Sequence, residues 1–318
     1  MTTFHVLVPD SVDQSAIDKL NAISDFTVTA PGKMSADELL AAVPDADALI
    51  VRSASKVTAE VLAAADKLKV IARAGVGYDN IDVDAATERG IAVANTPGGN
   101  TISTAEHAFA LMLALARHVP EAEISMRDGK WDRKSYMGVE LYGKTLGIIG
   151  FGRIGQAIAK RAFGFEMTVV AHDPYVTATD LDVELIGLDD LYARSDFITL
   201  HSLITDETRG MINADSIARM KPGARIVNAA RGALIVESDL AEAIKSGQVA
   251  GVALDVYDPE PPQPDNPLIG LPGVVHTPHL AASTTEAQVA VAVEAADIII
   301  DALLKDEYRN VVNPAVVK

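Results

Sequence analysis

The sequence predicts an α/β protein that is built from two parallel-sheet domains. Its 318 residues exceed the usual length of a single domain, which is about 150 residues. Short apolar runs alternate with amphipathic stretches along nearly the whole chain, as in proteins whose helices connect parallel strands. A glycine-rich turn, Gly150–Gly155, lies near the middle of the chain, so that enough residues precede it to form a separate domain.

The first hundred residues contain four apolar runs that we interpret as strands, with amphipathic helices between them. The expected strands are His5–Val8, Ala48–Val51, Val70–Ala72 and Ile91–Ala94, and two of the expected helices are Ser15–Ile23 and Ala59–Ala65. A loop over residues 95–99 follows. A long helix is expected next, over Thr101–Val119, because Ala108, Leu111, Met112 and Leu115 recur at helical spacing.

The rest of the chain continues the alternation and then ends in a helix. Strands are expected at Leu146–Ile149, Thr168–His172, Phe197–Leu200, Arg225–Asn228, Val252–Leu254 and Val274–His276. The proline-rich stretch 258–267 is a long loop, and such loops in compact domains are more often functional than accidental. A final helix is expected over Thr285–Leu304, with Val289, Val293, Ala296, Ile300 and Leu303 on its apolar face. If this helix returns to the first block, one domain comprises residues 1–97 and 285–318, and residues 98–284 form a domain inserted into it.

The composition excludes several classes of partner. Lys and Arg number 27 and Asp and Glu 44, which gives a formal charge of −17. Such a surface repels nucleic acids and anionic lipids, so we expect neither nucleic acid nor membrane as a partner. The chain contains no cysteine, which excludes disulfides and thiolate chemistry. Its first residues resemble a strand rather than a signal sequence, so a cytoplasmic location is expected.

The glycine-rich turn predicts a dinucleotide site. Gly150, Gly152 and Gly155 lie between an expected strand and a helix-like run, and Asp173 follows the next strand. This is the Rossmann arrangement, in which the backbone and the helix N-terminus approach a pyrophosphate. Asp173 would accept hydrogen bonds from the adenosine ribose and would repel a 2′-phosphate, which favours NAD over NADP. The alternatives are a tight turn without a ligand and a carboxylate that only caps the turn before Pro174.

Three polar residues follow the ends of later strands and predict hydride-transfer chemistry. Arg231, Glu260 and His279 each lie at or just beyond the carboxyl end of an expected strand, which is where open parallel sheets bind ligands. A histidine can exchange the proton that accompanies hydride transfer, a neighbouring carboxylate can orient it, and a guanidinium can hold an α-keto carboxylate. Each residue taken alone would more often be an ordinary solvated or interface side chain, and it is the three together that indicate a site.

Several segments together carry a resemblance to a known family. They are Val51–Thr58, Ala72–Asp82, Asn95–Asn100, Gly129–Lys134, Gly150–Gly155, Asn228–Gly232 and Pro278–Thr284. On these segments the chain resembles the D-2-hydroxyacid dehydrogenase family over nearly its whole length. The resemblance implies a flavodoxin-like substrate domain, an inserted NAD-binding Rossmann domain, a small 2-hydroxy or 2-keto acid as substrate, and no metal. It also implies a homodimer or a higher assembly, for which the Thr101–Val119 helix and the Trp131 segment are the interface candidates.

The resemblance further implies roles for individual residues. Arg231, Glu260 and His279 would be catalytic. NAD contacts are implied, besides the three glycines, at Arg153, Ile154, Asp173, Ser202, Ala229, Ala230, Asp255 and Ala282. Substrate contacts are implied at Arg52, Ser53, Gly75, Val76, Gly77 and Asn100. Physically, the Gly75–Gly77 amides could hold a carboxylate, and Arg52 could attract negative charge, although an ordinary solvated arginine is the alternative for Arg52.

The resemblance also orders the candidate activities. The Arg52 and Trp131 segments favour the branch of the family that oxidises 3-phospho-D-glycerate to 3-phosphohydroxypyruvate with NAD, in serine biosynthesis. Reduction of glyoxylate, hydroxypyruvate or another 2-keto acid is the alternative within the family, and an NAD-sensing corepressor-type binding protein is an alternative from another class. Because the chain ends at Lys318, we expect no C-terminal regulatory domain and no feedback through one.

Overall fold

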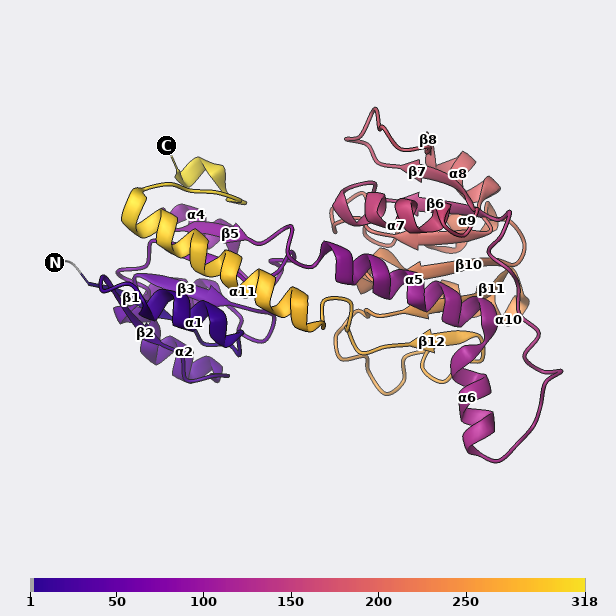
Figure 1. The fold of residues 1–318 in the computed structure, drawn as a ribbon, viewed down its shortest axis with the longest axis horizontal. Helices are drawn as coiled ribbons and strands as arrows, with labels where there is room; N and C mark the ends of the chain where they lie inside the picture. The colour runs from indigo at the N-terminus through magenta and orange to yellow at the C-terminus, as the bar shows by residue number, and fades with distance from the viewer. Residues whose placement is uncertain (1–2, 318) are drawn as a thin grey trace. The chain divides into compact units, whose positions relative to one another are not determined.

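The computed structural model describes residues 3–317, which fold into two compact units. Unit 1 comprises Met1–Asn100 and Ser283–Lys318, and unit 2 comprises Thr101–Ala282. The boundaries expected from the sequence lie after residues 97 and 284. Each unit is a parallel sheet with helices on both faces, which confirms the predicted fold class (Figure 1).

Unit 1 is built on a five-stranded parallel sheet in the order β2-β1-β3-β4-β5. The strands are β1 (Phe4–Leu7), β2 (Phe26–Thr29), β3 (Ala48–Val51), β4 (Val70–Arg73) and β5 (Ala92–Asn95). Helices α1 (Gln14–Asn21) and α11 (Thr285–Ile300) cover one face, and α2 (Ala36–Ala42), α3 (Ala59–Ala64) and α4 (Val83–Glu88) cover the other. This strand order is the flavodoxin-like one.

The helix α11 brings the end of the chain back to unit 1, and its buried face agrees only in part with the expected one. Val291, Ala292, Ala295 and Ile299 pack into the core beneath the sheet, whereas Val289 is 36% exposed. Of the five residues assigned to the apolar face, Ala296 is buried, and Ile300 and Leu303 pack against the same core while partly buried. Val289 and Val293 lie outside this core cluster, and the spacing misplaces them because alanine, valine and isoleucine occur on all sides of this helix. The helix also ends at Ile300, and a π-helical turn, Asp301–Lys305, follows it.

Unit 2 is built on a seven-stranded parallel sheet in the order β12-β11-β10-β9-β6-β7-β8. The strands are β6 (Thr145–Ile149), β7 (Thr168–His172), β8 (Glu184–Leu185), β9 (Phe197–Leu200), β10 (Ala224–Asn228), β11 (Val249–Leu254) and β12 (Val274–His276). Helices α5 (Thr101–Arg117) and α7 (Arg153–Phe163) cover one face, and α8 (Leu188–Arg194), α9 (Ala214–Ala218) and α10 (Glu237–Ser246) cover the other. The order reverses between β6 and β9, which creates the crevice where such sheets bind nucleotides.

The expected helix Thr101–Val119 is two helices in the structure. The helix α5 ends at Arg117, and α6 (Val119–Arg127) begins after His118, which adopts a left-handed backbone with φ 51°. The face predicted for α5 is confirmed, because Ala108, Leu111, Met112 and Leu115 are buried. Short turns at Val43–Asp45, Gly232–Leu234 and Pro314–Val316 complete the helical elements. Between residues 3 and 317 none of the helices has the length and apolar character that crossing a membrane requires.

Candidate active site

The glycine turn after β6 forms a cradle at the sheet's crevice. Gly150 has φ 92°, and a Cβ atom there would lie 2.6–2.7 Å from backbone atoms of His201 and Ser202, which follow β9. A Cβ atom on Gly155 would overlap with the carbonyl oxygen of Gly150. Gly152 caps α7 without a side-chain hydrogen bond, and the space beside it is open. The turn is therefore closely packed inside and accessible at the helix N-terminus, which suits a pyrophosphate.

The residues expected to contact NAD lie around this cradle. Arg153 and Ile154 begin α7, Ser202 lies across the turn, and Ala229 and Ala230 follow β10. Asp173 follows β7, and its carboxylate accepts hydrogen bonds from the amides of Phe151 (2.8 Å) and Tyr175 (2.9 Å). It thus caps its own turn and fixes the glycine turn, while each carboxylate oxygen can still accept a second hydrogen bond. The ribose contact stays a prediction.

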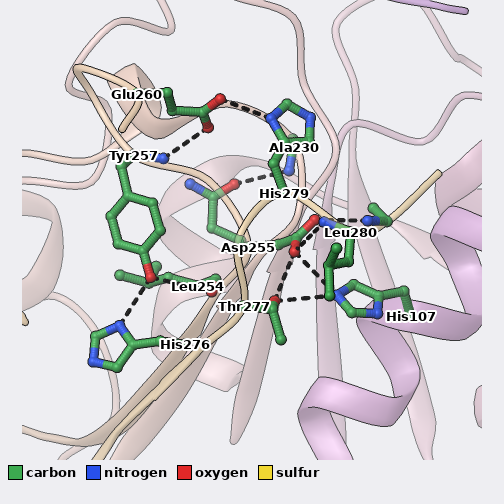
Figure 2. A network of polar contacts seen from close by, with 12 residues as sticks. His107, Ala230, Leu254, Asp255, Tyr257, Glu260, His276, Thr277, His279 and Leu280 are labelled. Atoms are coloured by element: carbon green, nitrogen blue, oxygen red, sulfur yellow. Dashed lines mark hydrogen bonds and ion pairs between the residues drawn. The ribbon is translucent and has the colours of Figure 1, made fainter. Parts of the chain in front are cut away.

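Glu260 and His279 form a hydrogen-bonded pair at the carboxyl edge of the same sheet (Figure 2). His279 Nδ1 lies 2.7 Å from Glu260 Oε2, and the Tyr257 amide donates to Glu260 Oε1 at 3.1 Å. Burial raises the pKa of Glu260, but the hydrogen bond and charge of His279, the Tyr257 amide and the charge of Arg231 together hold it below its usual range. Since the ionised carboxylate only accepts, Nδ1 carries a proton, and Nε2 is left for a substrate.

Arg231 lies in a loop that packs against the segment leading to Glu260. It precedes the short helix Gly232–Leu234, and Asn228 Nδ2 donates to its carbonyl oxygen at 2.8 Å. A Cβ atom on Gly232 would overlap with the backbone of Tyr257, so the two loops touch at this point. The structure thus brings together, within unit 2, all three residues that the sequence assigns to catalysis.

Asp255, expected to contact NAD, holds the loop that carries His279. Its carboxylate is fully buried and accepts hydrogen bonds from the amides of Leu280 (2.7 Å) and Ala281 (2.8 Å). Its carbonyl oxygen accepts a further hydrogen bond from the His279 amide at 2.8 Å. Ala282, also expected near NAD, ends unit 2 directly after this loop. Contacts of Asp255 and Ala282 with the cofactor stay predictions.

Unit 1 presents two loops with the residues expected to bind substrate. The loop of Arg52 and Ser53 follows β3 and is fixed from both sides. Asp10 Oδ2 accepts from the amides of Arg52 (2.6 Å) and Ser55 (3.2 Å), and Asn80 Nδ2 donates to their carbonyl oxygens at 2.7 and 2.6 Å. No pattern in the sequence marks Asp10 or Asn80, because their partners lie 25 to 45 residues away in the chain.

The loop of Gly75, Val76 and Gly77 follows β4 and corrects one expectation. The Gly75 amide donates to Thr96 Oγ1 at 2.6 Å within the core, so it is not available to hold a carboxylate. That leaves the Val76 and Gly77 amides for this role. A Cβ atom on Gly75 would overlap with the Arg73 guanidinium, which therefore covers this loop. Asn100, the remaining expected contact, ends this part of unit 1, and its Oδ1 has no hydrogen-bond partner within residues 3–317.

Comparisons with known proteins agree with this geometry. Residues 109–281 match the family model described as D-isomer specific 2-hydroxyacid dehydrogenase, NAD binding domain. A D-3-phosphoglycerate dehydrogenase of Archaeoglobus fulgidus is 52% identical over 97% of this chain, but the chain covers only 59% of that relative's length. A hydroxypyruvate reductase of Thermotoga maritima is 49% identical over 92% of this chain and 96% of its own length. The crystal structure of the TT0316 protein of Thermus thermophilus superposes with a TM-score of 0.90 at 39% identity, covering 97% of this chain and 100% of that one.

Proposed function

Because the chain belongs to the D-isomer specific 2-hydroxyacid dehydrogenase family, we propose that it oxidises 3-phospho-D-glycerate to 3-phosphohydroxypyruvate with NAD. The observation that carries the proposal is the Glu260–His279 pair beside Arg231, at the sheet edge that also holds the glycine cradle. This constellation suits the interconversion of a hydroxyl and a carbonyl group next to a carboxylate. The 52% identity to a relative named D-3-phosphoglycerate dehydrogenase supports the choice of substrate.

The chemistry follows from the positions of the three side chains. NAD, when bound at the Gly150–Gly155 cradle, supplies the acceptor for the hydride that leaves C2 of the substrate. His279 Nε2 takes the proton of the C2 hydroxyl, and Glu260 stabilises the imidazolium that forms. Arg231 holds the substrate carboxylate through two parallel hydrogen bonds. The proton then passes from His279 to water, which balances the reaction.

Phosphate recognition requires cationic groups that outweigh the net charge of −17. The structure offers two in unit 1. Arg73 ends β4 and pairs in register with Val51 of β3, so Arg52, the next residue, lies at the same edge of the sheet. Arg52 Nη1 donates to the Ser11 carbonyl at 3.1 Å, an exposed contact that a phosphate could replace. We infer that Arg52 and Arg73 bind the phosphate group.

A second candidate is reduction of hydroxypyruvate or glyoxylate, favoured by one specific observation. A relative named hydroxypyruvate reductase, from Thermotoga maritima, is 49% identical to this chain, close to the 52% of the relative named D-3-phosphoglycerate dehydrogenase. The same site would run in the opposite direction, with protonated His279 donating to the carbonyl oxygen. The unphosphorylated substrate would gain little from Arg52 or Arg73.

A substrate panel with two variants separates the candidates. For 3-phosphoglycerate, Arg52→Ala and Arg73→Ala should each lower kcat/KM by about 10- to 100-fold, as expected for the loss of a charged hydrogen bond. With glyoxylate and hydroxypyruvate they should have much smaller effects, and Lys56→Ala, in the same region, should behave as wild type throughout. Equal effects on all substrates would refute the phosphate assignment. Steady NADH formation from any 2-hydroxy acid would exclude a purely NAD-sensing binding protein.

We also propose that the protein acts as a homodimer. The helix α6 and the segment after it expose large apolar side chains, which soluble monomers rarely gather in one region. These are Ile124 (57% exposed), Met126 (53%), Trp131 (76%), Met137 (83%) and Tyr142 (65%). A second copy of this chain is the occupant that the family resemblance favours for this surface.

A further inference from the structure

A histidine outside the catalytic trio lies in contact with the buried Asp255 (Figure 2). His107 belongs to α5, the helix that covers one face of the unit 2 sheet. Its Nε2 lies 3.1 Å from Asp255 Oδ1 and 3.2 Å from Thr277 Oγ1. Thr277 Oγ1 in turn donates to Asp255 Oδ1 at 2.6 Å. The three side chains therefore form a closed triangle, although His107 and Thr277 lie 170 residues apart in the chain.

The donors and acceptors of this triangle are determined by chemistry. Burial raises the pKa of Asp255, but hydrogen bonds from His107, Thr277 and the amides of Leu280 and Ala281 hold it below its usual range. The carboxylate is therefore ionised and accepts every one of these hydrogen bonds. His107 Nε2 must carry a proton that it shares between the carboxylate and the Thr277 hydroxyl. An ionised carboxylate without exposed surface is costly unless such donors surround it.

Asp255 also fixes the backbone conformation of His279, the proposed catalytic histidine. His279 has φ 54°, a left-handed conformation that costs a residue with a side chain on the order of 1 kcal/mol or more. Three successive amides, those of His279, Leu280 and Ala281, donate to the carbonyl or carboxylate oxygens of Asp255. These hydrogen bonds hold the loop in its strained form and aim the His279 ring at Glu260.

We propose that His107 is a positioning residue for catalysis: by holding Asp255 from α5, it fixes the loop that presents His279 to Glu260 and the substrate. The inference rests on the proposed catalytic role of His279. His107 donates to the side of the Asp255 carboxylate that also binds Thr277 and Leu280. Its removal lets that carboxylate and the loop shift together, which changes the geometry of proton transfer without touching the glycine cradle.

Four variants test this role through single-turnover NADH formation and NAD affinity. His107→Ala should slow the single turnover by about 10- to 100-fold, the size expected for a hydrogen bond to a charged group, and any loss of NAD affinity through the shifted Asp255 should be clearly smaller. Thr277→Val, which removes only the hydroxyl, should slow it in the same direction. His107→Gln should restore most of the rate, because its amide nitrogen can donate to Asp255. Glu106→Gln, one residue earlier on α5 and paired with Arg161, should behave as wild type.

The pH dependence of kcat/KM separates positioning from mere stability. In His107→Ala the pH profile of kcat/KM should move toward that of the Glu260→Gln variant, because the His279 ring is no longer held against Glu260. A uniform loss of NAD binding and thermal stability, with an unchanged profile, would overturn the proposal, as would a full rate in both His107→Ala and Thr277→Val. His279→Ala distinguishes failure of the proposed function from failure of the positioning role of His107. If it keeps a full rate, the proposed function fails; if it loses turnover while both other variants keep it, only the positioning role fails.

Discussion

Unit 2 should lose stability in mild acid through a single buried histidine, His201. This residue follows β9 beside the glycine cradle, and its Nε2 lies 2.8 Å from the hydroxyl of Thr199. Although part of the residue reaches the surface, its Nδ1 is fully covered and has no hydrogen-bond partner within residues 3–317. Burial therefore lowers the pKa of His201 to about 3, because the charged imidazolium could not be solvated there.

The sign and size of the effect follow from proton linkage. Below pH 6.5, the ordinary pKa of histidine, the unfolded chain binds a proton at His201, while the folded chain stays neutral until about pH 3. Unfolding thus takes up a proton, and folded stability falls as the pH drops through this window. Between pH 7 and pH 5 the loss from this one residue amounts to about 2 kcal/mol.

The assay compares the wild type with His201→Gln, which cannot titrate but can still bond with Thr199. Urea unfolding without NAD, followed by circular dichroism at pH 7 and pH 5, gives the free energy of unfolding for both proteins. The wild type should lose about 2 kcal/mol more than the variant over this interval. His5→Gln, in unit 1, controls for the loss of one histidine. Equal losses in the wild type and His201→Gln would refute the reasoning.

Two further predictions concern the cofactor and the assembly. Replacing Asp173 by serine should shift the ratio of the kcat/KM values for NAD and NADP toward NADP by on the order of 10- to 100-fold, because the carboxylate that would bind the ribose and repel a 2′-phosphate is gone. An unchanged ratio would mean that Asp173 does not face the ribose. Trp131→Glu should convert the dimer into single chains in analytical ultracentrifugation, because the substitution would bury a charge in the interface. Leu304→Glu, in unit 1, is the control and should leave the dimer intact. A wild type that sediments as a single chain would contradict the proposed homodimer.

Strands with a continuous apolar run could be predicted from the sequence, including the edge strands β5 and β12, whereas the edge strands β2 and β8 could not. The residues of β9, Phe197–Leu200, are all buried and form a continuous apolar run, so its bounds were predicted to the residue. The strands β2 and β8 were missed because edge positions tolerate polar residues such as Thr27, Thr29 and Glu184. The break at His118 was also missed, because apolar spacing continues through it.

At the candidate site, the sequence indicated which residues end strands, but not which groups they bond. Arg231, Glu260 and His279 could be proposed from the sequence because chemistry-bearing side chains follow three successive strands. The contacts of His107, Asp10 and Arg73 depend on the folded backbone, and no local pattern in the sequence marks these residues. Gly75 shows the same limit, since its amide is taken by Thr96, 21 residues further along.

The return of α11 to unit 1 has a consequence for the order in which the chain matures during synthesis. Residues 101–282 are contiguous, so unit 2 has all its residues before Val291, Ala295 and Ile299 of α11 leave the ribosome. Until then the apolar face of β1, β3 and β4 lacks its largest helix. At about 5 to 20 residues per second this interval lasts roughly 10 to 40 s. The nascent chain should therefore be most prone to chaperone binding after its first hundred residues, and ribosome profiling of chaperone-bound nascent chains would reveal that window.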